Sequence, residues 1–140
     1  MEGTVLIIDT DKNFCSLTMR LFADHDFEAV TIEDSEQGLS LLSKGKYDVA
    51  IIDMSMETFR EKATAAITKS RNGTAIILLS ECYRHDIECL ARGLMPAFYF
   101  VKPVDFADLY AVAVRISEIK SRRKMQALQR MKYREGVLHE

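Results

Sequence analysis

The stretch Tyr47-Asp48-Val49-Ala50-Ile51-Ile52-Asp53-Met54-Ser55-Met56 decides the fold. Its four consecutive apolar residues, Val49 to Ile52, lie between polar groups, which is typical of a short strand buried on both faces of a parallel sheet. Asp53 stands where this strand ends. Ligands bind outside the carboxyl ends of the strands in open parallel α/β sheets, so Asp53 is a candidate site residue. An aspartate in this position can also begin a loop or cap the next helix.

The rest of the chain alternates between strand and helix patterns. Each parallel strand pair needs a crossover connection, usually a helix that covers the sheet, so this alternation predicts an α/β fold with a doubly wound, five-stranded parallel sheet. Turn residues such as Gly45, Asn72-Gly73 and Gly93 stop the expected helices. The expected strands are 4–8, 27–32, 48–53, 74–79 and 97–101, and the expected helices are 11–24, 34–44, one within 57–70, 83–92 and one from 105 onward.

The composition is that of a single globular domain, because 140 residues with 48% hydrophobic and 29% charged side chains can bury one sizeable core. No apolar run approaches the roughly 20 residues of a membrane span, and the N-terminus lacks the pattern of a signal peptide. We therefore expect a cytoplasmic protein without membrane contact. Cys15, Cys82 and Cys89 include no Cys-x-x-Cys pair and are expected to be reduced packing residues.

The formal net charge of −2 conceals an asymmetry. Residues 1–114 hold 11 Lys+Arg and 18 Asp+Glu, a net charge of −7, whereas residues 115–140 hold 8 and 3, a net charge of +5. Basic helices can follow nucleic-acid phosphates. However, Leu128 and Met131 need a partner surface, which favours an extension that leads toward a further domain or packs against a second subunit. Direct nucleic-acid binding is not expected, and Gly136 is expected to end this helix.

Polar side chains follow four of the predicted strands. Asp9, with Asp11 nearby, follows the first strand, Asp53 the third, Ser80 the fourth and Lys102 the fifth. In a parallel sheet all of them project from the same edge, where two converging carboxylates suit Mg²⁺, which binds oxygen ligands and keeps several waters. A carboxylate beside Mg²⁺ and a lysine can receive a phosphoryl group, since the cations neutralise its oxygens.

From residue 3 to about 120, the sequence resembles a receiver domain of a two-component response regulator. The resemblance implies the CheY-like form of the flavodoxin fold, with strand order 2-1-3-4-5 and an extended C-terminal helix. We expect residues 1–121 to form the receiver domain and 122–140 a basic helical extension or linker toward an output domain or dimer partner. The segments that carry the resemblance are Val5-Leu-Ile-Ile-Asp9, Tyr47-Asp48 through Met56, Ile76-Ile-Leu-Leu-Ser80, Gly93 and Tyr99-Phe-Val-Lys102-Pro103.

The resemblance implies a signalling switch, not an enzyme that turns over a substrate. The donor would be a sensor histidine kinase or a phosphotransfer protein, and a homodimer through the last helices is a further expectation. The peptide bond before Pro103 is usually cis in this family. The implied roles are Asp53 as phosphoacceptor, Asp9, Asp53 and the backbone carbonyl of Ser55 as Mg²⁺ ligands, Lys102 and Ser80 as phosphoryl contacts, and Ser80 with Tyr99 as the switch pair.

Several positions depart from the family pattern. Thr10 replaces a second acidic residue that usually binds the metal, so we expect weaker Mg²⁺ affinity. Asp11 is a candidate substitute ligand, and a helix cap is the alternative role for it. Glu57 stands where the family usually has proline. Glu81 stands where a small residue is typical, and its charge would lie near an incoming phosphoryl group.

Two alternative functions follow from the same residues. Thr10 and Glu81 are compatible with a receiver-like interaction module that works without phosphorylation. Leu6-Ile-Ile-Asp9-Thr-Asp11 also resembles the nucleophile motif of haloacid-dehalogenase-like phosphohydrolases, with Asp9 as the nucleophile and Asp11 as the acid. Against this reading, Asn13 occupies a position where that family has threonine or valine, and neither a downstream acidic pair nor a cap domain is evident.

Overall fold

Five parallel strands form one sheet in the order β2-β1-β3-β4-β5, in a computed structural model that describes residues 3–45, 47–56, 59–70 and 73–139. The predicted alternation and strand order are confirmed, with element bounds shifted by a few residues. The elements are β1 (Gly3–Ile8), α1 (Lys12–Asp24), β2 (Phe27–Ile32), α2 (Ser35–Lys44), β3 (Val49–Asp53), α3 (Phe59–Ser70), β4 (Ala75–Ser80), α4 (His85–Gly93), β5 (Phe98–Val101) and α5 (Phe106–His139).

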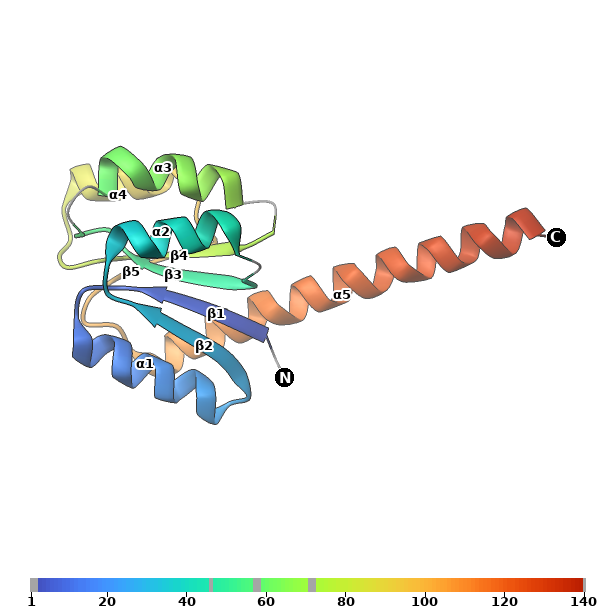
Figure 1. The fold of residues 1–140 in the computed structure, drawn as a ribbon, viewed down its shortest axis with the longest axis horizontal. Coiled ribbons are helices and arrows are strands. Elements are labelled where there is room, and N and C mark those ends of the chain that lie inside the picture. Colours follow the sequence, from blue (N-terminus) through green and yellow to red (C-terminus); the bar gives the residue numbers. More distant parts are fainter. Residues whose placement is uncertain (1–2, 46, 57–58, 71–72, 140) are drawn as a thin grey trace.

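Helices cover both faces of the sheet (Figure 1). Successive side chains of a strand point to opposite faces. Leu6 and Ile8 of β1 therefore pack in the core on the side of α2, α3 and α4, whereas Val5 and Ile7 pack on the side of α1 and α5. Every residue of β3 is buried. This explains why the central strand is a continuous apolar run and not an alternating one.

Local sequence signals fix the ends of α1 and α2. The Asp11 side chain accepts a hydrogen bond from the amide of Phe14, and the Asp34 side chain accepts one from Gln37, so each aspartate caps the helix that follows it.

α2 also passes close to β1. A Cβ atom at Gly38 would lie 2.7 Å from Cγ2 of Ile8, so only glycine permits this approach.

The last helix has two different halves. Leu109 and Ala113 of α5 are fully buried against the sheet, whereas residues 121–136 are exposed. At about 1.5 Å per residue the 34-residue helix is roughly 50 Å long, and its second half projects away from the body (Figure 1). The expectation that Gly136 ends it was wrong, because α5 continues to His139. A single glycine costs a helix only about 1 kcal/mol, which does not stop it.

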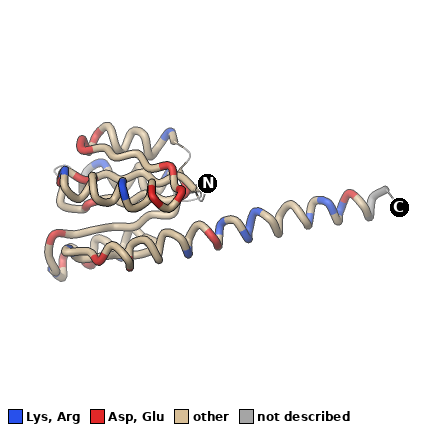
Figure 2. Tube along the Cα trace, turned by 90° about the horizontal axis from the view of Figure 1, so that it is seen from below, with Lys and Arg blue, Asp and Glu red and all other residues tan. Residues whose placement is uncertain are grey.

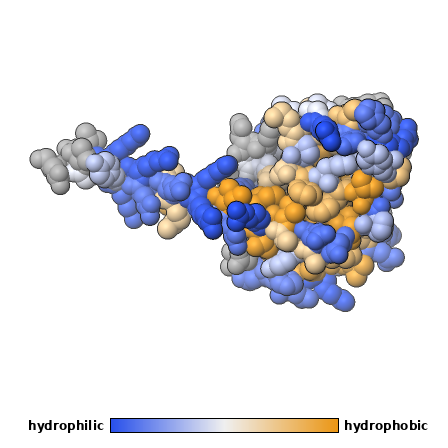
Figure 3. Space-filling view, turned by 180° about the vertical axis from the view of Figure 1, so that it is seen from behind, coloured by the Kyte–Doolittle hydropathy of each residue, from blue (hydrophilic) through white to orange (hydrophobic). Residues whose placement is uncertain are grey.

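The projecting half of α5 is rich in basic side chains (Figure 2) and mostly hydrophilic where it leaves the body (Figure 3). It nevertheless exposes four large apolar or aromatic side chains. Among the described helices, none combines the length and apolar character that a bilayer span requires. The exposed large side chains of this half are Met125, Leu128, Met131 and Tyr133.

The cysteines differ in their surroundings. Cys15 is buried in α1, as the sequence suggested, and all three thiols are free. Cys82 and Cys89 are exposed, so the expectation that they pack in the core was wrong. Cys82 lies in the loop after β4, and Cys89 lies on a solvent-facing position of α4, a helix of which only Ala91 is buried.

A polar clamp holds α5 where it leaves the body. The ammonium of Lys120 donates to the backbone carbonyls of Gly73 (2.6 Å) and Asp48 (3.1 Å) and pairs with the Asp48 carboxylate (3.3 Å). The same carboxylate accepts from the amide of Thr4 (2.9 Å). Burial opposes ionisation of Asp48, but the Thr4 amide and the Lys120 charge outweigh it and hold its pKa below the usual value.

We expect Asp48→Ala to lower the free energy of unfolding by about 1–3 kcal/mol, because it removes the acceptor of the Thr4 amide and a partner of Lys120. The lowered pKa places this stabilisation above the unfolded-state pKa of about 3.9, and it is lost as the pH falls through the folded-state value. Urea unfolding at several pH values measures both effects. Asp24→Ala, an exposed acid of α1, is the control. An equal loss in both variants, or one independent of pH, would contradict the role of the clamp.

Candidate functional site

One lysine and two buried aspartates meet at the carboxyl edge of the sheet. The ammonium of Lys102 donates to Oδ2 of Asp9 at 2.8 Å and to Oδ2 of Asp53 at 3.2 Å. Both aspartates are only 1% exposed. The predicted convergence of these three side chains is therefore present, and the two carboxylates share a single cation.

The strand register explains the convergence. Ile8 of β1 pairs with Ile52 of β3, so Asp9 and Asp53, the next residues along these two strands, lie side by side. Lys102 follows β5, which is separated from β3 by β4, and only a long side chain can span that distance. Its peptide bond to Pro103 is cis, as expected. The site lies at the strand tips, opposite the edge where the projecting half of α5 begins (Figure 1).

The charges of the site perturb one another strongly. Burial raises the pKa of the Asp9 carboxyl above its usual value, although its hydrogen bonds to Lys102 and to the Asp11 amide oppose this effect. Burial alone would lower the pKa of Lys102, but the carboxylates of Asp9 and Asp53 outweigh it and raise this pKa. Lys102 is therefore a fixed positive charge at neutral pH, held against the two acids.

Ser55 adds a contact that the sequence did not suggest. Its amide donates to Oδ1 of Asp53 at 2.9 Å, and its hydroxyl donates to the same oxygen. The family resemblance implied a role only for the Ser55 backbone carbonyl, as a metal ligand. Both oxygens of Asp53 are thus engaged, Oδ1 by Ser55 and Oδ2 by Lys102, and the carboxylate is held in one orientation.

The two residues of the expected switch pair are in contact. The hydroxyl groups of Ser80 and Tyr99 lie 2.7 Å apart, and the Ser80 hydroxyl is also 3.1 Å from the carbonyl oxygen of Cys82, to which it donates. Ser80 is buried at the end of β4, and its partner is on the neighbouring strand β5. The Ser80 hydroxyl is therefore in direct contact with an aromatic side chain of β5.

The residues that depart from the family pattern have different positions. Thr10 is exposed next to Asp9. The Asp11 side chain caps α1, and its amide donates to Oδ1 of Asp9 at 2.9 Å. Glu57 lies outside the described residues. Glu81 reaches the ammonium of Lys102 at 3.4 Å, which makes it a third carboxylate on the same cation.

Two residues of α1 also contact the site, and for one of them, Cys15, the sequence predicted only a packing role. The ring of Phe14 lies 4.8 Å from the Lys102 ammonium, a cation–π contact on the inner side of the lysine. The Cys15 thiol donates to the backbone carbonyl of Asp9 at 3.2 Å. Burial, followed by the charge of Asp9, raises the pKa of Cys15 to about 11, so this thiol stays neutral. Nothing in the helical pattern distinguishes these contacts from ordinary packing.

The donor set fits Mg²⁺ in part. Among the described residues there is no group of three or more His, Cys, Asp or Glu side chains arranged to hold a metal. Two carboxylates are nevertheless enough for Mg²⁺, which commonly binds through one or two and completes its shell with waters. The raised pKa of Asp9 is also consistent with a metal site. Burial disfavours the ionised form of this carboxyl, and a cation bound beside it would stabilise that form. Ser55 and Asp11 remain predicted as further ligands.

Comparison with known proteins identifies the family of the chain. The family model of the response regulator receiver domain matches residues 5–114. None of the curated protein sequences matches the chain.

Among solved structures, a receiver domain protein from Clostridium thermocellum has a TM-score of 0.71 at 22% identity, over 85% of this chain and 97% of that one. A Burkholderia pseudomallei response regulator with a phosphorylated aspartic acid, a calcium ion and citrate has a TM-score of 0.66 at 15% identity (88% and 74%). NtrX from Brucella abortus has a TM-score of 0.74 at 18% identity (91% and 30%).

The raised pKa of Asp9 predicts a pH-dependent stability in the absence of divalent cations. The folded protein keeps this proton at pH values where the unfolded chain has lost it, so wild-type stability falls as the pH rises from about 4 through the folded-state pKa. Asp9→Asn has no proton to lose and should gain stability relative to wild type over this range. Urea unfolding between pH 4 and 8 tests this, with Asp11→Asn as control. A difference that does not change with pH would contradict it.

Proposed function

The chain belongs to the response regulator receiver domain family, and on this premise we propose that Asp53 accepts a phosphoryl group from a sensor histidine kinase or a phosphotransfer protein. Receiver domains are signalling domains, so we propose a switch of a two-component system, located in the cytoplasm, and not an enzyme with a separate substrate. The observation that supports this best is the pair of buried acids, Asp9 and Asp53, held by the single cation of Lys102.

The proposed transfer uses the Asp53 carboxylate as nucleophile. One of its oxygens forms the new bond to phosphorus while the bond between phosphorus and the donor nitrogen breaks, and the donor imidazole keeps that electron pair. Lys102 shifts from the carboxylate to the phosphoryl oxygens and neutralises part of their charge. Asp9, Asp53 and the Ser55 carbonyl would hold Mg²⁺, which supplies further neutralisation of the transferred group.

We propose that the hydroxyl pair of Ser80 and Tyr99 responds to the phosphorylation of Asp53. Ser80 has one proton, which it donates to the Cys82 carbonyl, and its oxygen accepts from Tyr99. When a phosphoryl group is present, Ser80 can turn this proton toward a phosphoryl oxygen. The Cys82 carbonyl then loses its donor, the loop between β4 and α4 is released, and Tyr99 follows Ser80.

We propose that this rearrangement alters an association surface on α4, β5 and α5. Phe98 of β5 is 45% exposed, although its ring lies 4.7 Å from that of Phe100, and Met95 beside it is also exposed. Figure 3 shows apolar surface on the body where α5 leaves it. A second subunit or an output domain, reached through residues 122–140, is the proposed partner of this surface and of the projecting helix.

One alternative keeps the fold and omits phosphorylation. It is favoured by the contact between Glu81 and Lys102, which occupies the cation that a phosphoryl group needs, and by the absence of a second acid at Thr10. The haloacid-dehalogenase-like alternative uses Asp9 as nucleophile, whereas the family model that matches the chain is that of the response regulator receiver domain. The identity of the phosphorylated aspartate separates all three functions.

We expect incubation with acetyl phosphate and millimolar Mg²⁺ to add one phosphoryl group, located on Asp53 by mass spectrometry after borohydride reduction. Asp53→Asn should abolish the labelling, because it removes the nucleophile. Asp24→Asn is the control, since Asp24 is an exposed acid at the end of α1 and has no part in the site. Label on Asp9 would indicate the hydrolase, and no label on any aspartate in either wild type or Glu81→Gln would favour the phosphorylation-independent module.

The hydroxyl pair gives a second prediction. Ser80→Ala should keep labelling of Asp53 but remove the coupling to Tyr99, because the phosphoryl group loses its contact to β4. The tyrosine signals in NMR spectra should then shift on beryllofluoride addition in wild type and not in Ser80→Ala. Tyr110→Phe serves to assign the spectrum. Equal shifts of the Tyr99 signals in wild type and Ser80→Ala would exclude Ser80 as the link.

A further inference from the structure

Glu81 differs from the other two acids that contact Lys102. Asp9 and Asp53 are 1% exposed and accept additional backbone hydrogen bonds, from Asp11 and Ser55. The Glu81 side chain is 58% exposed, and its contact with Lys102 is the longest of the three, at 3.4 Å. Glu81 is therefore a solvent-exposed charge beside the lysine, whereas the two aspartates are buried.

Glu81 also lines two depressions beside the site. A depression of about 220 Å³ between the ends of β3 and β4 is lined by Ser55, Ser80 and Glu81. A second depression, of about 440 Å³, lies over Phe14 and Lys102, and Glu81 lines it as well. The two depressions border the site, the first at Ser55 and Ser80 and the second at Lys102, and the Glu81 carboxylate lines both.

The charge of Glu81 acts on the donor in two ways. Phosphoryl donors are anions, and two like charges repel over several ångströms where the solvent screens them only in part. The carboxylate also occupies Lys102, the ammonium that must turn to the incoming phosphoryl oxygens. A small donor from solution has only these charge contacts to bind with. A donor held by a protein surface brings docking energy that can offset the repulsion.

We propose that Glu81 is a specificity-determining residue, which disfavours small anionic phosphoryl donors by competing for Lys102 and thereby restricts phosphorylation to donors presented by a docked protein. The inference rests on the proposed phosphorylation of Asp53. Glu81 does not touch the acceptor itself and acts through Lys102, so it is a positioning residue and not a catalytic one.

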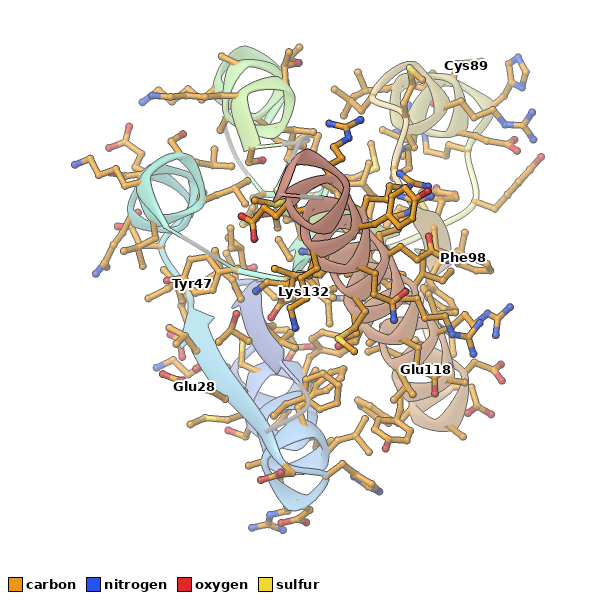
Figure 4. The ribbon with its side chains drawn as sticks, turned by 90° about the vertical axis from the view of Figure 1, so that its right-hand side faces the viewer. Glu28, Tyr47, Cys89, Phe98, Glu118 and Lys132 are labelled. Carbon is orange, nitrogen blue, oxygen red and sulfur yellow. The ribbon has the colours of Figure 1, made fainter. Side chains whose placement is uncertain are left out.

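The test compares wild type with Glu81→Gln, which keeps the shape of the side chain and removes its charge. The control is Glu28→Gln, because Glu28 is an exposed acid of β2 at the edge of the sheet away from α4 (Figure 4). The initial rate of Asp53 labelling is measured with acetyl phosphate, a dianion at neutral pH, and with phosphoramidate, which has one negative charge fewer. Each series is run at low and at high ionic strength.

We expect Glu81→Gln to be labelled roughly three- to tenfold faster than wild type by acetyl phosphate at low salt, and this gain should shrink toward unity at 1 M salt, where the screening length is about 3 Å. The gain should be smaller with phosphoramidate, because the donor charge is smaller. Glu28→Gln should behave as wild type. A purely structural effect of Glu81 would not depend on donor charge or salt.

The outcomes distinguish failure of the proposed role of Glu81 from failure of the proposed phosphorylation of Asp53. If Asp53 is labelled at the same rate in wild type and Glu81→Gln, or if the gain is unaffected by salt, the role of Glu81 is wrong and the proposed function stands. Labelling of Glu81→Gln without labelling of wild type supports the inference in its strongest form. If neither protein is labelled with either donor, the proposed function fails, and the role of Glu81 fails with it.

Discussion

The ammonium of Lys102, shared by two buried carboxylates, is the interaction on which the site depends. Asp9 and Asp53 end neighbouring strands and would repel each other in a medium that screens charge poorly. Lys102 comes from the end of β5 and balances part of that charge, which links three strand ends. The same balance makes the site responsive, because any group that takes Lys102 away also changes the two acids.

Thr10 and Glu81, which depart from the family pattern, both change the set of acids around the site. One acid is absent on the metal side of the pocket, and one is present on the solvent side of Lys102. A site of this kind still holds its lysine firmly, but it offers fewer ligands to a metal and a less open entrance to an anion.

The two halves of α5 have different surroundings. Its first half is part of the core beneath the sheet, where Leu109 and Ala113 are fully buried. Its second half begins at the clamp of Lys120 with Asp48 and Gly73, at the edge opposite Asp53, and carries basic and exposed apolar side chains away from the body.

The sequence by itself determined the alternation of strands and helices, the parallel sheet and the edge at which Asp9, Asp53, Ser80 and Lys102 gather, because hydrophobic periodicity and strand ends are local properties. It did not reveal the Ser55 hydroxyl on Asp53, the Phe14 ring against Lys102 or the exposure of Cys82 and Cys89, and it placed the end of α5 too early. These features depend on side-chain direction and on contacts between distant segments. Only the tertiary structure decides them, since a residue's partners are fixed when the elements pack and not by its neighbours in the chain.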